Sequence, residues 1–300
     1  MNRKNVWAAT ATAVAVAAVT AGVVALNPGK PVDAAAGTTD ATQDLRDAVA
    51  ALRAGNYTFT RTGAGFIADV QEGTAALPGG ASIRHSGTFA VARVGTDTRL
   101  QYLLHVQQET REQYLQYWEK NAPAAEGQKI KKIYDLLDGT KWVRADEAKL
   151  AEAAAVDEQS GLDAMAQLPT AEQPDATGAG LLVAAVTGAE RSGDVVTGTL
   201  DATGGEPFLE QVFSDAAYLY GPAAKTMPFR ATLDGQGRLT EFTVTMPAEI
   251  TSQPAEPVEP TPPLVITISG YGTTRAPSLP EPARGELTTE AYDLLARDTD

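Results

Sequence analysis

Residues 227–246 read MPFRATLDGQGRLTEFTVTM, and this stretch decides the fold class. Apolar and polar residues alternate on both sides of a break at residues 234–237. Alternation with period two gives a strand one apolar face and one solvated face. The glycines of the break, Gly235 and Gly237, can adopt the positive φ that a tight reversal needs. The stretch therefore predicts a β-hairpin with one buried face.

Other segments of the chain show either the strand period or the helix period. Alternation predicts strands at residues 57–61, 66–70, 82–92, 99–106, 195–200 and 264–269, and a second hairpin formed by residues 130–137 and 141–144. Helical patterns predict helices at residues 41–54, 145–168, 181–186, 206–220 and 286–296. Residues 106–120 suit either a strand or a helix. This order lacks a βαβ rhythm, so the sequence predicts an α+β fold with one antiparallel sheet and helices over one of its faces.

The N-terminal segment, residues 1–40, carries the pattern of an export signal. Arg3 and Lys4 precede an apolar run at residues 7–26, and such a basic flank stays in the cytoplasm. A small-residue cleavage site ends at Ala36, several residues beyond the run. Because the run is long enough to span a membrane, we favour a retained hydrophobic helix in the cytoplasmic membrane over a signal peptide cleaved near Ala36. Either outcome places the rest of the chain outside the cytoplasm.

The remainder divides into a folded domain at residues 41–280 and an acidic tail at residues 281–300. Within the domain, residues 251–263 are rich in Pro and Glu. Proline cannot extend a strand ladder, so we expect an exposed loop there. Three further prolines, at positions 277, 280 and 282, precede or begin the tail. We expect the tail to be loosely attached.

The composition excludes several classes of function. The net charge is −14 and the pI about 4.6, which argues against nucleic acid as a partner, since its phosphates require Lys and Arg. The same charge argues against adhesion to an anionic membrane surface through charge alone. The chain has no cysteine, so disulfides, Cys-ligated zinc, iron–sulfur clusters and a thiol nucleophile are excluded.

Motifs that carry catalytic chemistry do not stand out in the sequence. There is no Gly-x-Ser-x-Gly elbow, no phosphate-binding glycine loop and no His-Glu-x-x-His, so we expect no enzyme activity, no catalytic residue, no metal and no cofactor. His85 and His105 lie on neighbouring predicted strands, but a metal pair would need carboxylate help, and positions on the solvated face are expected. A group of aromatic residues is expected to cap the core rather than to form a ligand platform: Trp142, Tyr114, Tyr117 and Trp118.

Three short phrases resemble the LppX/LprG-type lipoproteins. They are the turn at residues 233–239 with Asp-x-x-Gly-Arg-Leu, the pair Met246-Pro247 with the later strand at residues 265–272 that ends in Tyr-Gly, and residues 134–143, which contain Lys-Trp. The resemblance implies a LolA-like half-barrel, in which helices cover the concave face of one curved antiparallel sheet, and a role in carrying lipid outside the cytoplasmic membrane. The family's lipobox cysteine is absent here, so the N-terminal apolar run would have to supply the anchor.

The apolar face of such a sheet is the candidate ligand site. This face must be covered, and an incomplete cover of small, Ala-rich helices would leave a cavity for an apolar ligand. In the family, acyl chains are held in this way. Tight packing without a cavity is the alternative, and the sequence leaves both open. The expected lining consists of Phe59, Phe89, Leu100, Tyr102, Leu104, Leu209, Phe213, Phe229, Phe242, Val244, Met246, Ile266 and Ile268.

Two functions from different classes follow from these observations. The first is an exported, non-enzymatic carrier that holds a lipid or another hydrophobic small molecule in this cavity. The second is an exported sensory or regulatory domain that binds an envelope protein without a bound lipid, since related half-barrels occur in such sensors. Extraction of the purified protein with organic solvent, followed by mass spectrometry, separates the two.

Overall fold

The predicted hairpin is present as strands β9 (Met227–Leu233) and β10 (Leu239–Val244), which pair in antiparallel fashion. In β9 every second residue is buried, from Met227 to Leu233, as the alternation predicts. The computed structural model describes residues 38–64, 66–85, 89–104, 116, 120–121, 123–155, 168–204, 212–213, 216–250, 261–282 and 286–296.

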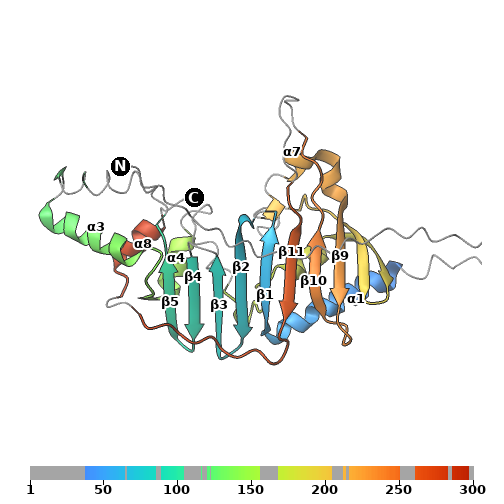
Figure 1. Cartoon of the computed structure of the whole chain (residues 1–300), viewed down its shortest axis with the longest axis horizontal. Coiled ribbons are helices and arrows are strands. Elements are labelled where there is room, and N and C mark those ends of the chain that lie inside the picture. The colour runs from blue at the N-terminus through green and yellow to red at the C-terminus, as the bar shows by residue number, and fades with distance from the viewer. Residues whose placement is uncertain are drawn as a thin grey trace, which may run out of the picture. The chain divides into compact units, whose positions relative to one another are not determined.

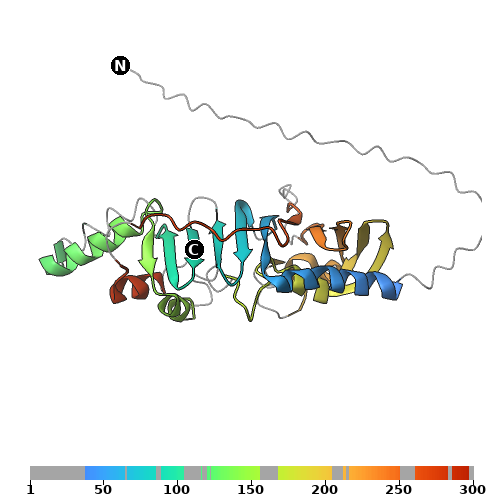
Figure 2. The same cartoon turned by 90° about the horizontal axis from the view of Figure 1, so that it is seen from below.

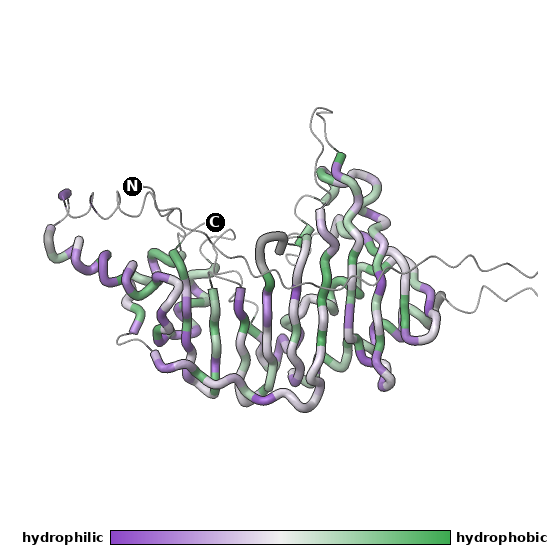
Figure 3. The backbone as a smooth tube through the Cα atoms, viewed as in Figure 1, coloured by the Kyte–Doolittle hydropathy of each residue, from purple (hydrophilic) through white to green (hydrophobic). Residues whose placement is uncertain are grey.

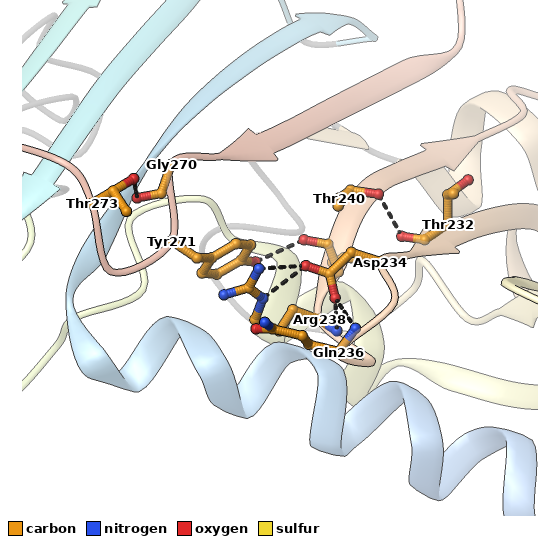
Figure 4. Close-up of polar contacts among 9 residues, drawn as sticks. Thr232, Asp234, Gln236, Arg238, Thr240, Gly270, Tyr271 and Thr273 are labelled. Atoms are coloured by element: carbon orange, nitrogen blue, oxygen red, sulfur yellow. Dashed lines mark hydrogen bonds and ion pairs between the residues drawn. The ribbon is translucent and has the colours of Figure 1, made fainter.

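The turn of the hairpin is organised by the Asp234 carboxylate (Figure 4). Its Oδ1 accepts hydrogen bonds from the backbone N–H groups of Gln236 and Arg238, each at 2.9 Å, and its Oδ2 accepts from Arg238 Nε at 2.7 Å. The Arg238 guanidinium lies 4.8 Å from the centroid of the Tyr271 ring. The hydroxyl of Tyr271 donates to the Leu239 carbonyl at 2.7 Å. These contacts fix the hairpin against the segment that follows the last strand.

An eleven-stranded antiparallel sheet dominates the described residues (Figure 1). The strand order is β6-β5-β4-β3-β2-β1-β11-β10-β9-β8-β7, and the sheet is open, with β6 and β7 at its edges. Two meanders, β1–β6 and β7–β11, meet at the pairing of β1 with β11. The remaining strands are β1 (Asn56–Gly63), β2 (Phe66–Ala76), β3 (Gly80–His85), β4 (Phe89–Val94), β5 (Asp97–Tyr102), β6 (Val143–Ala145), β7 (Val186–Ser192), β8 (Val195–Leu200) and β11 (Leu264–Ser269).

Helices lie mainly on one side of this sheet, and a chain segment crosses the other side. Helix α1 contacts β7, β10 and α5, while α4 contacts α8, and α1, α4 and α8 share one side of the sheet (Figure 2). Residues 271–282 follow β11 past the ends of the central strands on the opposite side (Figure 2). The helices are α1 (Thr38–Ala50), α3 (Ala124–Leu136), α4 (Glu147–Ala154), α5 (Ala179–Ala184), α7 (Ala216–Tyr220) and α8 (Thr289–Leu295), with 3₁₀ helices η1 (Ala51–Ala54) and η3 (Gly221–Thr226).

The core lies on the helix-bearing face of the sheet. Hydrophobic and hydrophilic residues alternate along the strands (Figure 3), and the buried apolar residues of the sheet and helices form one cluster. In register across the sheet, one row of this face runs through Phe59, Gly73, Ile83, Val91, Leu100 and Val143. Phe59, Ile83, Val91, Leu100 and Val143 are each at most 2 % exposed, so the apolar face is sealed from solvent along this row.

Several sequence predictions are confirmed. The structure has an antiparallel sheet with helices, as the α+β prediction requires. The helix at residues 41–54 is present as α1 and η1, and the one at residues 181–186 as the slightly earlier α5. Strands β1, β5, β8 and β11 fall at predicted positions, and α8 falls within residues 286–296. The structure describes only parts of the helices predicted at residues 145–168 and 206–220, and these parts contain α4 and α7. Most of residues 106–120 and 251–263 lie outside the described residues.

The predicted strand at residues 130–137 is wrong, because residues 130–136 belong to helix α3 and Leu137 caps its end. Ile130, Ile133, Tyr134 and Leu137 recur with the helical spacing of three and four residues. The last three of them are buried, so burial of one helical face decides the conformation. Of the second hairpin only β6 remains, and it pairs with β5 instead.

The other corrections concern strand boundaries and the tail. Residues 82–92 are not one strand, since β3 ends at His85 and β4 begins at Phe89. Strand β2 extends well past residue 70, and β7 has no counterpart in the prediction. The described part of the tail is not loosely attached: Leu295 is fully buried, α8 contacts α4, and the Tyr292 hydroxyl accepts from the Asp146 N–H at 2.7 Å.

Membrane attachment was predicted for residues 7–26, which lie outside the described residues. In the part that the structure describes, no helix is long and apolar enough to cross a membrane.

Candidate functional site

The predicted ligand lining is gathered on the apolar face of the sheet. All but two of its residues are at most 6 % exposed and belong to one buried cluster. Met246 is partly buried and packs against that cluster, and Leu209 lies outside the described residues. The buried members are Phe59, Phe89, Leu100, Tyr102, Leu104, Phe213, Phe229, Phe242, Val244, Ile266 and Ile268.

Two glycines allow aromatic rings to lie low on this face. A Cβ on Gly73 would stand 2.0 Å from Phe59 Cε1, and a Cβ on Gly198 would stand 2.8 Å from Phe229 Cε1. Each ring therefore occupies the space above a glycine of the paired strand. The Phe229 ring also stacks on Phe242, with centroids 5.1 Å apart and an interplanar angle of 9°. Rings that lie along the sheet make its surface apolar and low in profile.

An irregular segment, residues 168–178, covers part of this face between β4 and β1. At β4, Arg93 Nη2 donates to the Pro169 carbonyl at 2.6 Å. At β1, the Tyr57 hydroxyl donates to the Pro174 carbonyl at 2.5 Å and accepts from the Ala176 N–H at 2.8 Å. Side chains of the sheet therefore hold this cover in place through its backbone.

Asp175 orders the end of the same segment where it enters α5. Its Oδ1 accepts from the Thr177 N–H at 2.9 Å and from Thr177 Oγ1 at 2.6 Å, while its Oδ2 accepts from the Gly180 N–H at 2.8 Å. Gly178 has a φ of +73°, a conformation that favours glycine, just before the helix starts. The carboxylate thus acts as a local cap.

A polar row interrupts the apolar face toward one end of the strands. Arg61 of β1 lies opposite Gln71 of β2, and Gln71 lies opposite His85 of β3. Arg61 and Gln71 are fully buried. Gln71 Nε2 forms a hydrogen bond with His85 Nε2, and the His85 ring meets the edge of Phe89 at a centroid distance of 5.9 Å. His85 therefore shares the face of Phe89, and its predicted position on the solvated face is wrong; His105 lies outside the described residues.

Arg61 is the charged member of this row. Its Nη1 donates to the Thr177 carbonyl at 3.5 Å, and its guanidinium lies 5.5 Å from the centroid of the Phe59 ring. Burial lowers the pKa of Arg61 to about 9, although the negative charge of Asp175 favours the protonated form. The side chain therefore remains a cation at neutral pH within the buried face of the sheet.

Two cavities lined by described residues lie away from the middle of the apolar face. A groove of about 430 Å³ lies on the solvated face beneath residues 277–280, and a recess of about 990 Å³ lies beside the β4–β5 turn and α4. Trp142 is half-buried, lines the groove and is not among the residues that form the buried cluster or pack against it, so the prediction that it caps the core is wrong. Tyr114, Tyr117 and Trp118 lie outside the described residues. Among the described residues, no group of three or more His, Cys, Asp or Glu is placed to hold a metal ion.

Arg61 and Gln71 belong to the site but were not predicted from the sequence. Arg61 follows Tyr57 and Phe59 at intervals of two, so strand alternation alone places it on the same face. Its charge points to the opposite face, because Arg is rarely buried. Gln71 carried no such signal, because β2 was expected to end one residue earlier.

Comparison with known proteins adds no family assignment. No protein-family model matches the chain, and no curated protein matches it. The resemblance to the LppX/LprG-type lipoproteins therefore stays a prediction that rests on its three phrases.

Proposed function

We propose that this protein is an exported, non-enzymatic carrier that holds a lipid or another hydrophobic molecule between the sheet and its cover, in a LolA-like half-barrel. It would work outside the cytoplasmic membrane, anchored by residues 7–26 or released by cleavage near Ala36. The resemblance of the sequence supports this proposal, and so does the single open antiparallel sheet with its helices on the apolar side.

The observation that carries the proposal is the nature of the cover over the central strands. Among the described helices, α1 makes its main sheet contacts at β7 and β10, whereas residues 168–178 run over the face between β4 and β1 as an irregular segment. A segment held by a few hydrogen bonds, each worth about 1 kcal/mol net, opens at lower cost than a packed helix. Displacing it exposes an aromatic surface that suits acyl chains.

The first experiment identifies the ligand directly. Protein purified from its own host is extracted with organic solvent, and the extract is analysed by mass spectrometry. We expect a stoichiometric amphiphile or hydrocarbon-rich compound. An extract that contains none from natively folded protein would favour the exported protein-binding domain instead.

A matched pair of variants then locates the site. Val244 is fully buried on the apolar face, and Thr245 next to it is exposed. An unpaired charge in the apolar face opposes ligand uptake, so Val244→Asp should abolish binding of a fluorescent fatty-acyl probe or destabilise the fold, whereas Thr245→Asp should change neither. Probe binding that survives in a folded Val244→Asp protein would place the ligand elsewhere.

A further inference from the structure

The groove of about 430 Å³ on the solvated face of the sheet has the size of a ligand site, since small-molecule sites measure roughly 300–1,000 Å³. Its floor consists of two rows of side chains in register across β11, β1, β2, β3 and β4. These residues alternate along the strands with Phe59, Ile83 and Val91, which are buried on the apolar face, so the groove is separate from the proposed lipid site. The first row is Thr267, Thr60, Glu72, Arg84 and Ala90, and the second is Ser269, Thr58, Thr74, Ser82 and Ala92.

The segment that follows β11 forms one wall of the groove, and its position is fixed (Figure 2). Asn56 Nδ2 donates to the Thr274 carbonyl at 3.0 Å, and Asn56 Oδ1 accepts from the Thr274 N–H at 2.9 Å. Pro277 and Pro280 line the groove, and a Cβ on Gly80 would lie 3.2 Å from Pro277 Cδ. Proline fixes its own φ. The wall is therefore in place before a ligand arrives.

The polar groups of the groove form a mixed set of donors and acceptors. Glu72 and Arg84 are exposed and lie opposite each other on β2 and β3. A carboxylate accepts hydrogen bonds, a guanidinium donates them, and the hydroxyls of Thr and Ser do both. The two charges balance within the groove. Such a set matches an uncharged ligand that carries many hydroxyl groups.

The half-buried indole of Trp142 adds a flat apolar surface to the groove. Trp142 directly precedes β6, which lies beyond β5 from the β4 end of both rows. At that end the rows finish in Ala90 and Ala92, whose side chains are small. An indole combines an apolar face with one N–H donor, and the C–H face of a sugar ring packs on such a surface while its hydroxyls point outward.

Other classes of ligand fit this groove less well. An extended peptide gains main-chain hydrogen bonds by adding a strand to a free sheet edge, but β1, β2, β3, β4 and β11 are each paired on both sides. An acyl chain would meet hydroxyls and charges rather than apolar side chains. The net charge of −14 opposes an acidic polymer.

We propose that this groove binds carbohydrate, as a neutral oligosaccharide with one ring packed on Trp142 and its hydroxyls bonded to Glu72, Arg84 and the Thr and Ser side chains. The inference goes beyond the carrier function and does not rest on it. Because the groove and the apolar face lie on opposite sides of the sheet, the sugar can bind whether or not the protein holds a lipid.

The experiment starts with the wild-type full chain on an array of immobilised neutral and acidic glycans. We expect it to bind at least one neutral oligosaccharide, and calorimetry with the soluble form of that glycan gives the affinity. Trp142→Leu keeps an apolar side chain but removes the flat ring, and should weaken binding by about 10-fold or more. Trp142→Phe keeps a flat ring and should stay within about threefold of wild type.

A second variant keeps the test valid if Trp142→Leu does not fold. Glu72 is exposed on the solvated face, so Glu72→Gln leaves the core untouched. It should weaken binding about 3- to 10-fold, because hydroxyls bond a charged acceptor more strongly than a neutral one. Glu190→Gln, at an exposed residue of the edge strand β7 outside the groove, should have no effect.

Three results would overturn the inference: binding of no neutral glycan on the array, a preference for acidic glycans, or an affinity that is unchanged in folded Trp142→Leu and Glu72→Gln proteins. Uptake of the fluorescent fatty-acyl probe, measured on the same samples, reports the carrier function separately. We expect this uptake to be the same in wild type and Glu72→Gln, so failure of the carbohydrate site would leave the carrier function standing.

Discussion

The Phe59 ring lies across the backbone of Gly73 on the paired strand, in the space that a Cβ of residue 73 would fill. The two residues form one unit at the centre of the apolar face, where the ring lies low only because its neighbour has no side chain. Phe229 and Gly198 form a similar pair on β9 and β8, but a Cβ at residue 198 would first meet the Gly188 carbonyl oxygen, at 1.9 Å.

Gly73→Ala should therefore destabilise the protein. The new methyl group would force the Phe59 ring off its position, and such overpacking costs about 1–3 kcal/mol of the free energy of unfolding. Gly188→Ala is the matched control, since nothing lies within 4 Å of a Cβ there, and the free energy should stay unchanged or rise by up to about 1 kcal/mol. Denaturant unfolding measures both. Equal losses of stability in the two variants would show that the Phe59 ring does not need a glycine at position 73.

Tyr57→Phe should loosen the cover at residues 168–178. The change removes the hydroxyl that bonds the Pro174 carbonyl and the Ala176 N–H, and unsatisfied buried groups cost about 1–3 kcal/mol. Hydrogen exchange should show faster opening of the segment. Tyr218→Phe, at a side chain that is 80 % exposed, should have no effect. Unchanged exchange rates of residues 170–180 in Tyr57→Phe would show that the Tyr57 hydroxyl does not hold the cover in place.

Titration of the Tyr57 hydroxyl should lower the stability of the protein at alkaline pH. Burial, and then the negative charge of Asp175, raise the pKa of Tyr57 above its usual value. The folded protein keeps this proton while the unfolded chain releases it above about pH 10, so the stabilisation is complete below pH 10 and is lost at up to about 1.4 kcal/mol per pH unit above it. Unfolding curves of wild type and Tyr57→Phe should therefore converge as pH rises. Parallel curves would contradict this assignment.

Val244→Trp distinguishes a cavity from a tight core. If the apolar face has room for a ligand, the indole should fill it, keep the melting temperature nearly unchanged and block the fluorescent fatty-acyl probe. If the face is fully packed, the same change should cost about 1–3 kcal/mol. Thr245→Trp, at the exposed neighbour, controls for the added ring. A destabilised Val244→Trp protein, together with a wild type that never binds the probe, would end the carrier proposal.

Export can be tested from both ends of the chain. Arg3 and Lys4 before the apolar run predict that residues beyond 30 lie outside the cytoplasm. A reporter enzyme that works only outside the cytoplasm should therefore be active when it is fused after Asp300. Intact-mass analysis of the mature chain should show a retained N-terminus. A new N-terminus at Gly37 would show that the segment is a cleaved signal peptide. Activity, in the same fusion position, of a reporter that works only in the cytoplasm would exclude export.

Sequence patterns predicted the elements whose burial is strictly periodic. Strands β9 and β11 bury every second residue, so alternation located them. Strand β7 escaped because it is an edge strand in which only Ala189 is buried, and a strand with one buried residue has no detectable period. The α3 segment was misassigned because Ile130, Ile133 and Tyr134 were read as a strand although their spacing is helical.

For the candidate site, the sequence predicted the apolar members but not the polar row. Phe59, Phe242 and Ile266 were expected on one face because hydrophobicity and phase agree there. At Arg61 the two signals conflict: the phase points inward and the charge points outward. The fold resolves the conflict in favour of phase, since β1 is paired on both sides and cannot rotate one residue independently.

The pairing of β1 with β11 also governs when the chain can fold. The hydroxyls of Thr58 and Ser269 share a hydrogen bond at 2.9 Å across a sequence separation of 211 residues. During synthesis, one side of β1 therefore has no strand to pair with until β11 (Leu264–Ser269) has been made. Closing so long a loop is slow, and the delay suits a polypeptide that is threaded across a membrane before it folds, as we propose for this one.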